Sequence, residues 1–309
     1  MLITVAICTW NRASLLKRTL AAFEKLIIPS DVQWELLVVN NNCTDHTDEV
    51  IKQFDKKLPI RRLFESQAGH SVARNCAIAK ANGQWILWTD DDVLVDPQWL
   101  SAYIKAIRSQ PKFAFVGGTI EPWFEKTPPK WLTRHLVNLE GAFAIIRRDL
   151  ETRPLKDEDD AIFGANMGFK TELLKSNLFD PNLGLVGNNP MRGDETELIS
   201  RLVELGHQGL WVGEAKVKHF IPNARMTTTY LWNFFKGLGQ AQTRISEPEN
   251  ATTLFGRPRW AVKAYASSWL ASNALLPLKN SMWLHHFKRA ARCAGVIQES
   301  RNNQKALSS

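Results

Sequence analysis

Three adjacent aspartates follow an apolar run in "ILWTDDDV", and their spacing suits the binding of a cation. Asp90 and Asp92 stand two residues apart with Asp91 between them. Two carboxylates at this spacing on a loop reach one hard divalent ion from the same side. Mg²⁺ or Mn²⁺ then takes its remaining ligands from phosphate oxygens and water. The alternative is a solvated acidic turn, but the position directly after a buried strand favours a metal site.

A second group of carboxylates stands in "RGDETEL", where Asp194, Glu195 and Glu197 fall in the first turn of an expected helix. Acids at a helix N-terminus are stabilised by the free backbone N–H groups, so capping explains one of them. The stretch holds more acids than a cap requires. One of them is therefore a candidate general base, provided that the fold brings it near the metal.

The elements that must position these groups alternate between strand and helix. Apolar runs of strand length are separated by segments with apolar residues at helical spacing. We expect Ser14 to cap the first helix and Gly83 to end the third. Repeated units of this kind predict an α/β fold with a mostly parallel sheet flanked by helices. The expected strands are 2–9, 34–42, 60–66 and 84–92, and the expected helices are 14–26, 47–57 and 71–82.

Polar residues follow three of these strands directly, at 9–12, 40–42 and 90–92. Ligands of open α/β sheets bind beyond the carboxyl ends of the strands, so the three clusters are expected on one rim. Arg74 begins a helix whose N-terminus favours anions, so it is a candidate for contact with a phosphate group. An equally good alternative is a surface arginine that forms an ion pair with an acid. The sequence has neither GxxxxGK[ST] nor GxGxxG, which excludes the common phosphate loops.

The positive charge lies almost entirely in the last part of the chain. The net charge is +8, and residues 257–309 hold nine Lys and Arg against one acid. From residue 227 onward the pattern becomes helical and rich in tryptophan. One interpretation is an interfacial surface that holds the protein on an anionic membrane. The other is a helical subdomain whose tryptophans pack against the rest of the protein. No nucleic-acid-binding module accompanies the charge, so we expect no nucleic-acid partner.

The N-terminal "MLITVAICTW" has no basic segment and no cleavage site, so it is expected to be a core strand rather than a signal peptide. No apolar run is long enough to predict a transmembrane helix. The four cysteines lack metal or redox spacing and suit a reducing compartment. We therefore expect a cytoplasmic protein, either free or peripheral on the cytoplasmic face of the membrane.

Six motifs together carry a resemblance to a known family. The motifs are "ICTWNR", "VVNNNCTD", "SVARN", "WILWTDDDV", "FGANMGF" and "GDETELISRL". Through them the chain resembles the family 2 glycosyltransferases of the Rossmann-like GT-A fold over roughly residues 2–225. The motifs stand in the family's order, and together they are specific although each alone is weak. The QxxRW signature of processive synthases is absent, which indicates transfer of single sugars.

The resemblance implies a nucleotide-diphosphate sugar donor, most often a UDP-sugar, and a Mn²⁺ or Mg²⁺ ion. Asp90 and Asp92 correspond to the metal and ribose positions of the DxD-type motif, with His219 as a further metal ligand. A structural role for this lone histidine is an equal alternative. Asn41 matches the position that reads the base, where aspartate is common. The remaining donor-side residues are Thr9, Trp10, Asn11, Arg12, Arg74 and Asp91.

The family's "GED" stands here as "GDE", with the acids exchanged. By alignment Glu195 is the general base and Asp194 its neighbour. The resemblance implies transfer with inversion to a hydroxyl of a saccharide or lipid-linked acceptor, in polysaccharide or glycoconjugate biosynthesis. Trp123 and Trp131 are candidate platforms for an acceptor sugar, and core packing is their alternative role.

The expected organisation is a nucleotide-sugar-binding half at 1–115, an acceptor-binding half at 116–226 and a basic helical region at 227–309. Two other functions stay open at this point. A nucleotidyltransferase also uses aspartates and a metal, but "CTWNRAS" lacks the glycine- and lysine-rich loop of that class. A non-catalytic nucleotide-sugar-binding protein of GT-A type is compatible with the exchanged acids.

Overall fold

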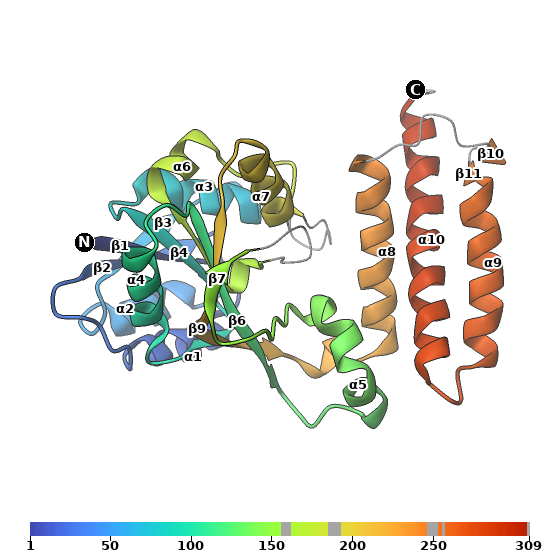
Figure 1. Ribbon diagram of the computed structural model, residues 1–309, viewed down its shortest axis with the longest axis horizontal. Coiled ribbons are helices and arrows are strands. Elements are labelled where there is room, and N and C mark those ends of the chain that lie inside the picture. Colours follow the sequence, from blue (N-terminus) through green and yellow to red (C-terminus); the bar gives the residue numbers. More distant parts are fainter. Residues whose placement is uncertain (156–161, 185–192, 246–252, 255–256, 308–309) are drawn as a thin grey trace. The chain divides into compact units, whose positions relative to one another are not determined.

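The computed structural model describes residues 1–155, 162–184, 193–245, 253–254 and 257–307. The chain divides into two compact units, which are described separately below. The first comprises residues 1–123, 144–189 and 193–220, and the second comprises the remaining residues. The two candidate sites both lie in the first unit. Figure 1 labels the elements of both units.

The first part of unit 1 alternates strand and helix as the sequence predicts. Each strand is a short apolar run, and each helix has one apolar face. The elements are β1 (Leu2–Thr9), α1 (Ala13–Phe23), β2 (Gln33–Asn40), α2 (Thr47–Phe54), β3 (Ile60–Phe64), α3 (His70–Lys80) and β4 (Trp85–Asp90).

The later part of unit 1 contains shorter strands, separated by helices and loops. It includes η2 (Gly164–Asn166), a turn of 3₁₀ helix. Its other elements are β5 (Val93–Val95), α4 (Trp99–Ser109), β6 (Phe115–Phe124), β7 (Thr152–Pro154), β8 (Met167–Lys170), α6 (Thr171–Ser176), α7 (Asp194–Glu204) and β9 (Gly209–Ile221).

Within the described residues these strands form one sheet in the order β3-β2-β1-β4-β8-β6-β9-β5, with β7 paired to β9. The strands β3, β2, β1 and β4 run parallel, so their carboxyl ends share one edge. The strands β8, β5 and β7 join by antiparallel pairing. The predicted fold class is confirmed: a central sheet with parallel strands flanked by helices, and a helical C-terminal part.

Apolar residues pack on both faces of the sheet, because successive side chains of a strand point to opposite sides. In β1, Val5 and Ile7 belong to one buried cluster, and Ala6 belongs to the other. The helix α1 contributes Leu16 to the first cluster, and α3 contributes Ala77 to the second. A sheet buried on both faces explains why its strands read as continuous apolar runs.

Two local predictions are wrong. Ser14 is not the cap of α1, because Asp45 accepts the hydrogen bond from the backbone N–H of Ala13 at 3.0 Å. Gly83 does not end α3, which stops at Lys80 with Ala81 in extended conformation. Gly83 is instead packed against β1, where a Cβ would collide with the backbone of Thr4. A close approach rather than a turn requires this glycine.

Unit 2 is mainly helical. The long helix α10 packs against both α8 and α9. Of its tryptophans, Trp283 is fully buried, while Trp260 and Trp269 are about half exposed. Within the described residues no helix is long and apolar enough to span a membrane. The elements are α5 (Lys130–His135), η1 (Leu136–Phe143), η3 (Asn223–Arg225), α8 (Thr228–Ile245), β10 (Thr253–Leu254), β11 (Arg257–Pro258), α9 (Arg259–Ala274) and α10 (Ser281–Leu307).

Candidate active site

The three aspartates lie at the turn between β4 and β5, beside the end of β1. The pairing of β1 with β4 places Thr9 next to this turn, and its Oγ1 donates to Asp91 Oδ2 at 2.8 Å. Arg12 Nη1 lies 3.0 Å from both Asp91 Oδ1 and Asp92 Oδ2. One guanidinium therefore neutralises part of the charge of two neighbouring carboxylates. The contacts explain how this short acidic run is tolerated at the end of a buried strand.

Asp90 and Asp92 meet His219, which β9 delivers by pairing with β5. One ligand atom from each residue lies within 4.8 Å of the others. His219 Nε2 is 3.5 Å from Asp92 Oδ1, and this buried oxygen accepts no hydrogen bond within the described part of the chain. Two carboxylate oxygens and an imidazole nitrogen are a donor set that suits Mn²⁺. The residues present therefore fit a divalent cation.

Asp91 is not among the residues that offer a ligand atom to that group. Its side chain is buried, and its described partners are Thr9 and Arg12. Burial raises the pKa of Asp91 to about 6, opposed by the attraction of Arg12 and reinforced by the neighbouring Asp92. Its backbone carbonyl also accepts from Thr19 Oγ1 at 2.9 Å. These contacts fasten the turn to β1 and α1, so that Asp91 positions the residues on either side of it.

The loop after β1 holds the other predicted donor-side residues. Asn11 has a positive φ of 52°, and its Oδ1 accepts from the backbone N–H of Thr44 at 2.7 Å. This bond joins the loops that follow β1 and β2. Trp10 is 45% exposed, so its ring is accessible to a ligand. The predicted cluster at the carboxyl ends of β1, β2 and β4 is therefore brought together on one edge.

Asn41 is buried, and its side chain is occupied by backbone partners. Its Nδ2 donates to the carbonyls of Glu65 and Gln67 at 3.1 and 2.7 Å, and its Oδ1 accepts from the N–H of Gly69 at 3.0 Å. Asn41 thus holds the loop that leads into α3. The assignment of Asn41 to base recognition stays a prediction.

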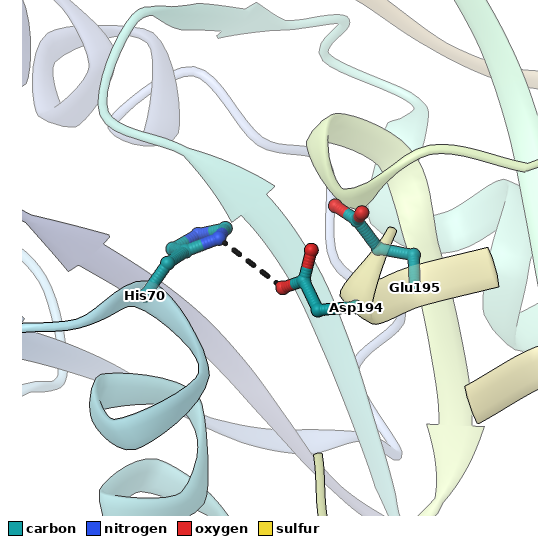
Figure 2. Close-up of side chains that lie close together, drawn as sticks. All are labelled: His70, Asp194 and Glu195. Carbon is teal, nitrogen blue, oxygen red and sulfur yellow. Dashed lines mark ion pairs between the residues drawn. The ribbon is translucent and has the colours of Figure 1, made fainter. Parts of the chain in front are cut away.

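The second group of carboxylates lies at the start of α7 and meets the start of α3. Arg74 is 1% exposed, and its Nη1 and Nη2 donate to Asp194 Oδ2 at 2.8 Å and Glu195 Oε1 at 3.0 Å. His70 stands one turn before Arg74 on α3. Its Nδ1 lies 3.5 Å from Asp194 Oδ2, and Figure 2 shows this pair beside Glu195. Two acids from one helix are therefore held by two basic side chains from another.

The electrostatic surroundings separate the two acids. Burial alone would raise the pKa of Asp194, but Arg74 and then His70 lower it well below its usual range. Burial raises the pKa of Glu195, and the charge of Asp194 raises it further, against the opposing effect of Arg74. A proton shared by the pair therefore resides on Glu195 while Asp194 stays ionised.

Arg74 also connects the two groups of acids. Burial alone would lower its pKa, but Glu195, Asp194 and then Asp90 raise it above the ordinary value. The Asp90 carboxylate thus lies within electrostatic range of the second cluster. Although His70, Asp194 and Glu195 are also close enough to share a cation, Arg74 already supplies their positive charge. This cluster is accordingly an ion-pair network rather than a metal centre.

Two residues of this network were not predicted from the sequence. His70 lies four residues before Arg74, a spacing that puts both on one helix face. Gly164, in "FGANMGF", packs against the network so closely that a Cβ would collide with Arg74 Nη2 and Glu195 Oε1. The motif that contains Gly164 was recognised in the sequence, but the contacts of this glycine could not be predicted from it.

The tryptophans proposed as sugar platforms both pack against protein groups. The Trp123 ring lies 4.9 Å from Phe220, and the Arg18 guanidinium lies 5.2 Å from it. Trp131 lies 5.9 Å from Trp283 in unit 2. Both indoles remain partly accessible. Their role in acceptor binding stays a prediction.

Comparison with protein families identifies a match to the model described as "Glycosyl transferase family 2", over residues 4–178. These residues make up more than half of the chain and include both the aspartate turn and Arg74. The family is the one that the six motifs resemble.

Similar proteins are found among both sequences and solved structures. "Succinoglycan biosynthesis protein ExoM" of Rhizobium meliloti (strain 1021) is 23% identical, over 96% of this chain and 91% of its own. "Validoxylamine A glucosyltransferase" of Streptomyces hygroscopicus subsp. jinggangensis is 31% identical over 34% of this chain and 25% of its own. The first similarity extends over nearly the full chain, whereas the second is confined to about a third of it.

The solved structures support the fold. The mannosyltransferase PcManGT from Pyrobaculum calidifontis, in complex with GDP-Man and Mn²⁺, superposes with a TM-score of 0.65 at 18% identity, covering 96% of this chain and 86% of its own. TarS residues 1–349 of S. aureus, in complex with UDP-GlcNAc, gives a TM-score of 0.53 at 14% identity, covering 99% and 92%. At these identities the likeness concerns architecture alone.

Proposed function

Because the chain belongs to glycosyl transferase family 2, we propose that it transfers one sugar from a nucleotide-diphosphate donor to an acceptor hydroxyl with inversion. Sugar transfer in glycan biosynthesis follows from the family and from relatives such as the succinoglycan biosynthesis protein. The donor is a UDP-sugar in this proposal, and the acceptor is a saccharide or a lipid-linked saccharide. The neighbours that hold GDP-Man and UDP-GlcNAc support a nucleotide-sugar donor.

The observation that carries the proposal is the opposite behaviour of two adjacent acids. Asp194 is held ionised by Arg74 and His70, while Glu195, whose side chain is 22% exposed, has a raised pKa. A general base works best when its pKa approaches the working pH, because it then accepts a proton readily while remaining mostly deprotonated. The pKa of Glu195 is shifted in the direction that this requirement calls for, and the pKa of Asp194 is shifted in the opposite direction.

The donor lies in this proposal against the aspartate turn, with a Mn²⁺ or Mg²⁺ ion held by Asp90, Asp92 and His219. When bound, such an ion acts as a Lewis acid that stabilises negative charge on a diphosphate leaving group. Arg12 keeps Asp92 in place through the contact at 3.0 Å. Trp10, being exposed, is available to contact the nucleotide.

The residues of the second cluster then prepare the acceptor. Glu195 takes the proton from the acceptor hydroxyl while the hydroxyl oxygen attacks the anomeric carbon on the face opposite the nucleotide. The bond between that carbon and the diphosphate oxygen breaks in the same displacement, and the nucleoside diphosphate leaves. Asp194 stays ionised and favours the arrival of that proton on Glu195. Arg74 fixes Glu195 through the hydrogen bond at 3.0 Å, which limits the loss of orientation during the reaction. Arg74 is thus a positioning residue.

A thermal-shift screen tests the donor proposal. UDP, GDP, CDP and dTDP are each added with and without Mn²⁺, because a ligand that binds only the folded state raises the melting temperature. We expect a Mn²⁺-dependent rise with UDP, lost in Asp92→Asn and kept in Asp55→Asn. Asp55 is exposed at the end of α2 and serves as the matched control. A chain that responds to none of the four nucleotides would contradict the proposal, and a rise with GDP alone would correct its donor.

A further inference from the structure

Unit 2 contains a cavity of about 600 Å³ over the middle helix of three. The helix α10 lies between α8 and α9 (Figure 1) and packs against both. Apolar side chains of α10, namely Leu284, Cys293 and Val296, line the cavity. Gln242 of α8 and Trp260 of α9 lie along its sides. The space is thus a groove with an apolar floor, and it is lined entirely by residues of unit 2.

The groove is positively charged. Lys288, Arg289 and Arg292 line it, and no described lining residue is acidic. None of the three forms an ion pair within the described part of the chain. Lys288 Nζ and Arg292 Cζ lie 5.2 and 5.9 Å from the centroid of Phe235, so one ring holds both cations near each other. Burial and the charge of Arg292 lower the pKa of Lys288, as expected where positive charge is not compensated.

The chain that surrounds the groove also carries basic residues without acidic ones. No acidic residue stands between positions 257 and 298, the stretch that contains α9 and most of α10. A surface without carboxylates over this length attracts an anion whose own charge is repeated or extended, such as a phospholipid surface. A single small anion would require only the three cations of the groove.

Exposed apolar side chains gather on the same helices. Of the fourteen large apolar residues that are exposed in the described chain, six fall between positions 260 and 282, on α9, the turn after it and the start of α10. Leu270, Leu278 and Met282 are each at least 60% exposed. Tryptophan, leucine and methionine next to basic residues are typical of helices that lie in a lipid interface. The six residues are Trp260, Trp269, Leu270, Leu276, Leu278 and Met282.

We propose that the groove formed by Lys288, Arg289 and Arg292 binds the phosphate of an anionic lipid, while the exposed apolar residues of 260–282 enter the hydrocarbon boundary. The apolar residues decide in favour of a lipid over a free phosphate. This inference concerns unit 2 alone, so it stands or falls independently of the donor proposed above. It extends the proposed activity by bringing the enzyme to a membrane, where a lipid-linked acceptor would be found.

Vesicle flotation of the full chain tests the inference. Vesicles of phosphatidylcholine are compared with vesicles that also contain phosphatidylglycerol. We expect binding only to the anionic vesicles, weakened about 100-fold in Lys288→Gln/Arg289→Gln/Arg292→Gln, because each basic residue near an anionic surface contributes roughly fivefold. The pair Arg289→Gln/Arg292→Gln spares the half-buried lysine and guards against misfolding. The matched control removes three exposed lysines of unit 1: Lys17→Gln, Lys25→Gln and Lys52→Gln.

The apolar part of the surface has its own variants. Leu278→Ser/Met282→Ser should weaken vesicle binding by about tenfold for each side chain that leaves the lipid. The control Ile27→Ser/Phe64→Ser, at comparably exposed positions in unit 1, should bind like the unaltered chain. Melting temperatures and the nucleotide-dependent thermal shift are measured on every variant, and we expect the thermal shift to be unchanged.

Three results would overturn the inference. The first is an absence of binding to anionic vesicles, and the second is an equal loss in the groove variant and in its lysine control. The third is binding of pyrophosphate, at matched ionic strength, that requires the three groove residues while the vesicles do not bind. That outcome would assign the groove to a free phosphate compound. If the nucleotide-dependent thermal shift is kept in any of these cases, the donor proposal stands although the membrane inference fails.

Discussion

Replacing Arg74 with methionine removes the cation that Asp194 and Glu195 share while keeping an apolar side chain of similar reach. Arg74 and Asp194 are nearly inaccessible, with side chains 1% and 4% exposed. Removing one partner of a buried ion pair costs about 3–5 kcal/mol of folding free energy. Because Glu195 is 22% exposed and can take up a proton, we expect the lower end of this range. At roughly 2–4 °C per kcal/mol, the melting temperature should fall by about 6–12 °C.

The assay is thermal unfolding followed by circular dichroism, performed as a double-mutant cycle. Arg74→Met is made in the unaltered chain and in Asp194→Asn/Glu195→Gln, where both carboxylates that pair with Arg74 are replaced. In the second background the cost should disappear or change sign, since Arg74 without its two acids is itself an unpaired buried charge, which methionine removes. Equal costs in both backgrounds would refute the reasoning, because they would show that Arg74 stabilises the fold without its acids.

The sign of the pH dependence offers an internal check. The pKa of Asp194 is lowered in the folded state, so its ion pair contributes stability above the ordinary aspartate pKa. This contribution is lost as the pH falls toward the lowered value. The difference between Arg74→Met and the unaltered chain should therefore be full at neutral pH and shrink below about pH 4. A difference that grows on acidification would contradict the ion-pair account.

Three further predictions concern the same two clusters. Gly164→Ala should lower kcat at least tenfold, because the added Cβ displaces Arg74 and Glu195. The control Gly237→Ala, in α8, places its Cβ in open space and should leave kcat unchanged. Similar kcat values for the two variants would contradict this prediction. The acidic limb of kcat/KM should lie above the ordinary glutamate pKa of about 4.3, because burial raises the pKa of Glu195 and the base must be deprotonated; a midpoint at or below that value counts against Glu195. His219→Ala should weaken Mn²⁺ binding at least tenfold, measured by titrating the nucleotide-dependent thermal shift; unchanged Mn²⁺ dependence would remove His219 from the site.

The sequence is informative about the sheet and about what stands at its edge. Strands that are buried on both faces have continuous apolar sequences. If these strands are parallel, the polar residues that follow them lie at the same edge of the sheet. This reasoning anticipated that Thr9, Arg12 and Asp90 would lie near one another. Their assignment to nucleotide and metal binding remains a prediction, as do the boundaries at residues 115 and 226. Part of the expected acceptor segment, residues 185–192, lies outside the described residues.

Contacts between distant segments were beyond the reach of sequence patterns. Arg74 and Asp194 are 120 residues apart, and nothing in either motif names the other as its partner. The cap of α1 comes from Asp45, in a different loop, rather than from the local Ser14. Gly83 is the residue type that often ends a helix, but here it allows two backbone segments to lie close together. In each case the sequence indicates a local preference of the residue, but contacts with distant parts of the chain determine what the residue does in the fold.

The most direct test of the account compares Glu195→Gln with Glu197→Gln, two residues on the same turn of α7. Glu197 is paired with Arg201 at 2.8 Å and takes no part in the Arg74 network. Sugar transfer and nucleotide affinity are measured for both variants with the donor that the thermal-shift screen identifies. The account predicts that Glu195→Gln loses about 10²–10⁴-fold in kcat, as expected for removal of a general base, while nucleotide affinity is kept. It predicts that Glu197→Gln retains both. Full transfer activity in Glu195→Gln would contradict the central claim that Glu195 activates the acceptor.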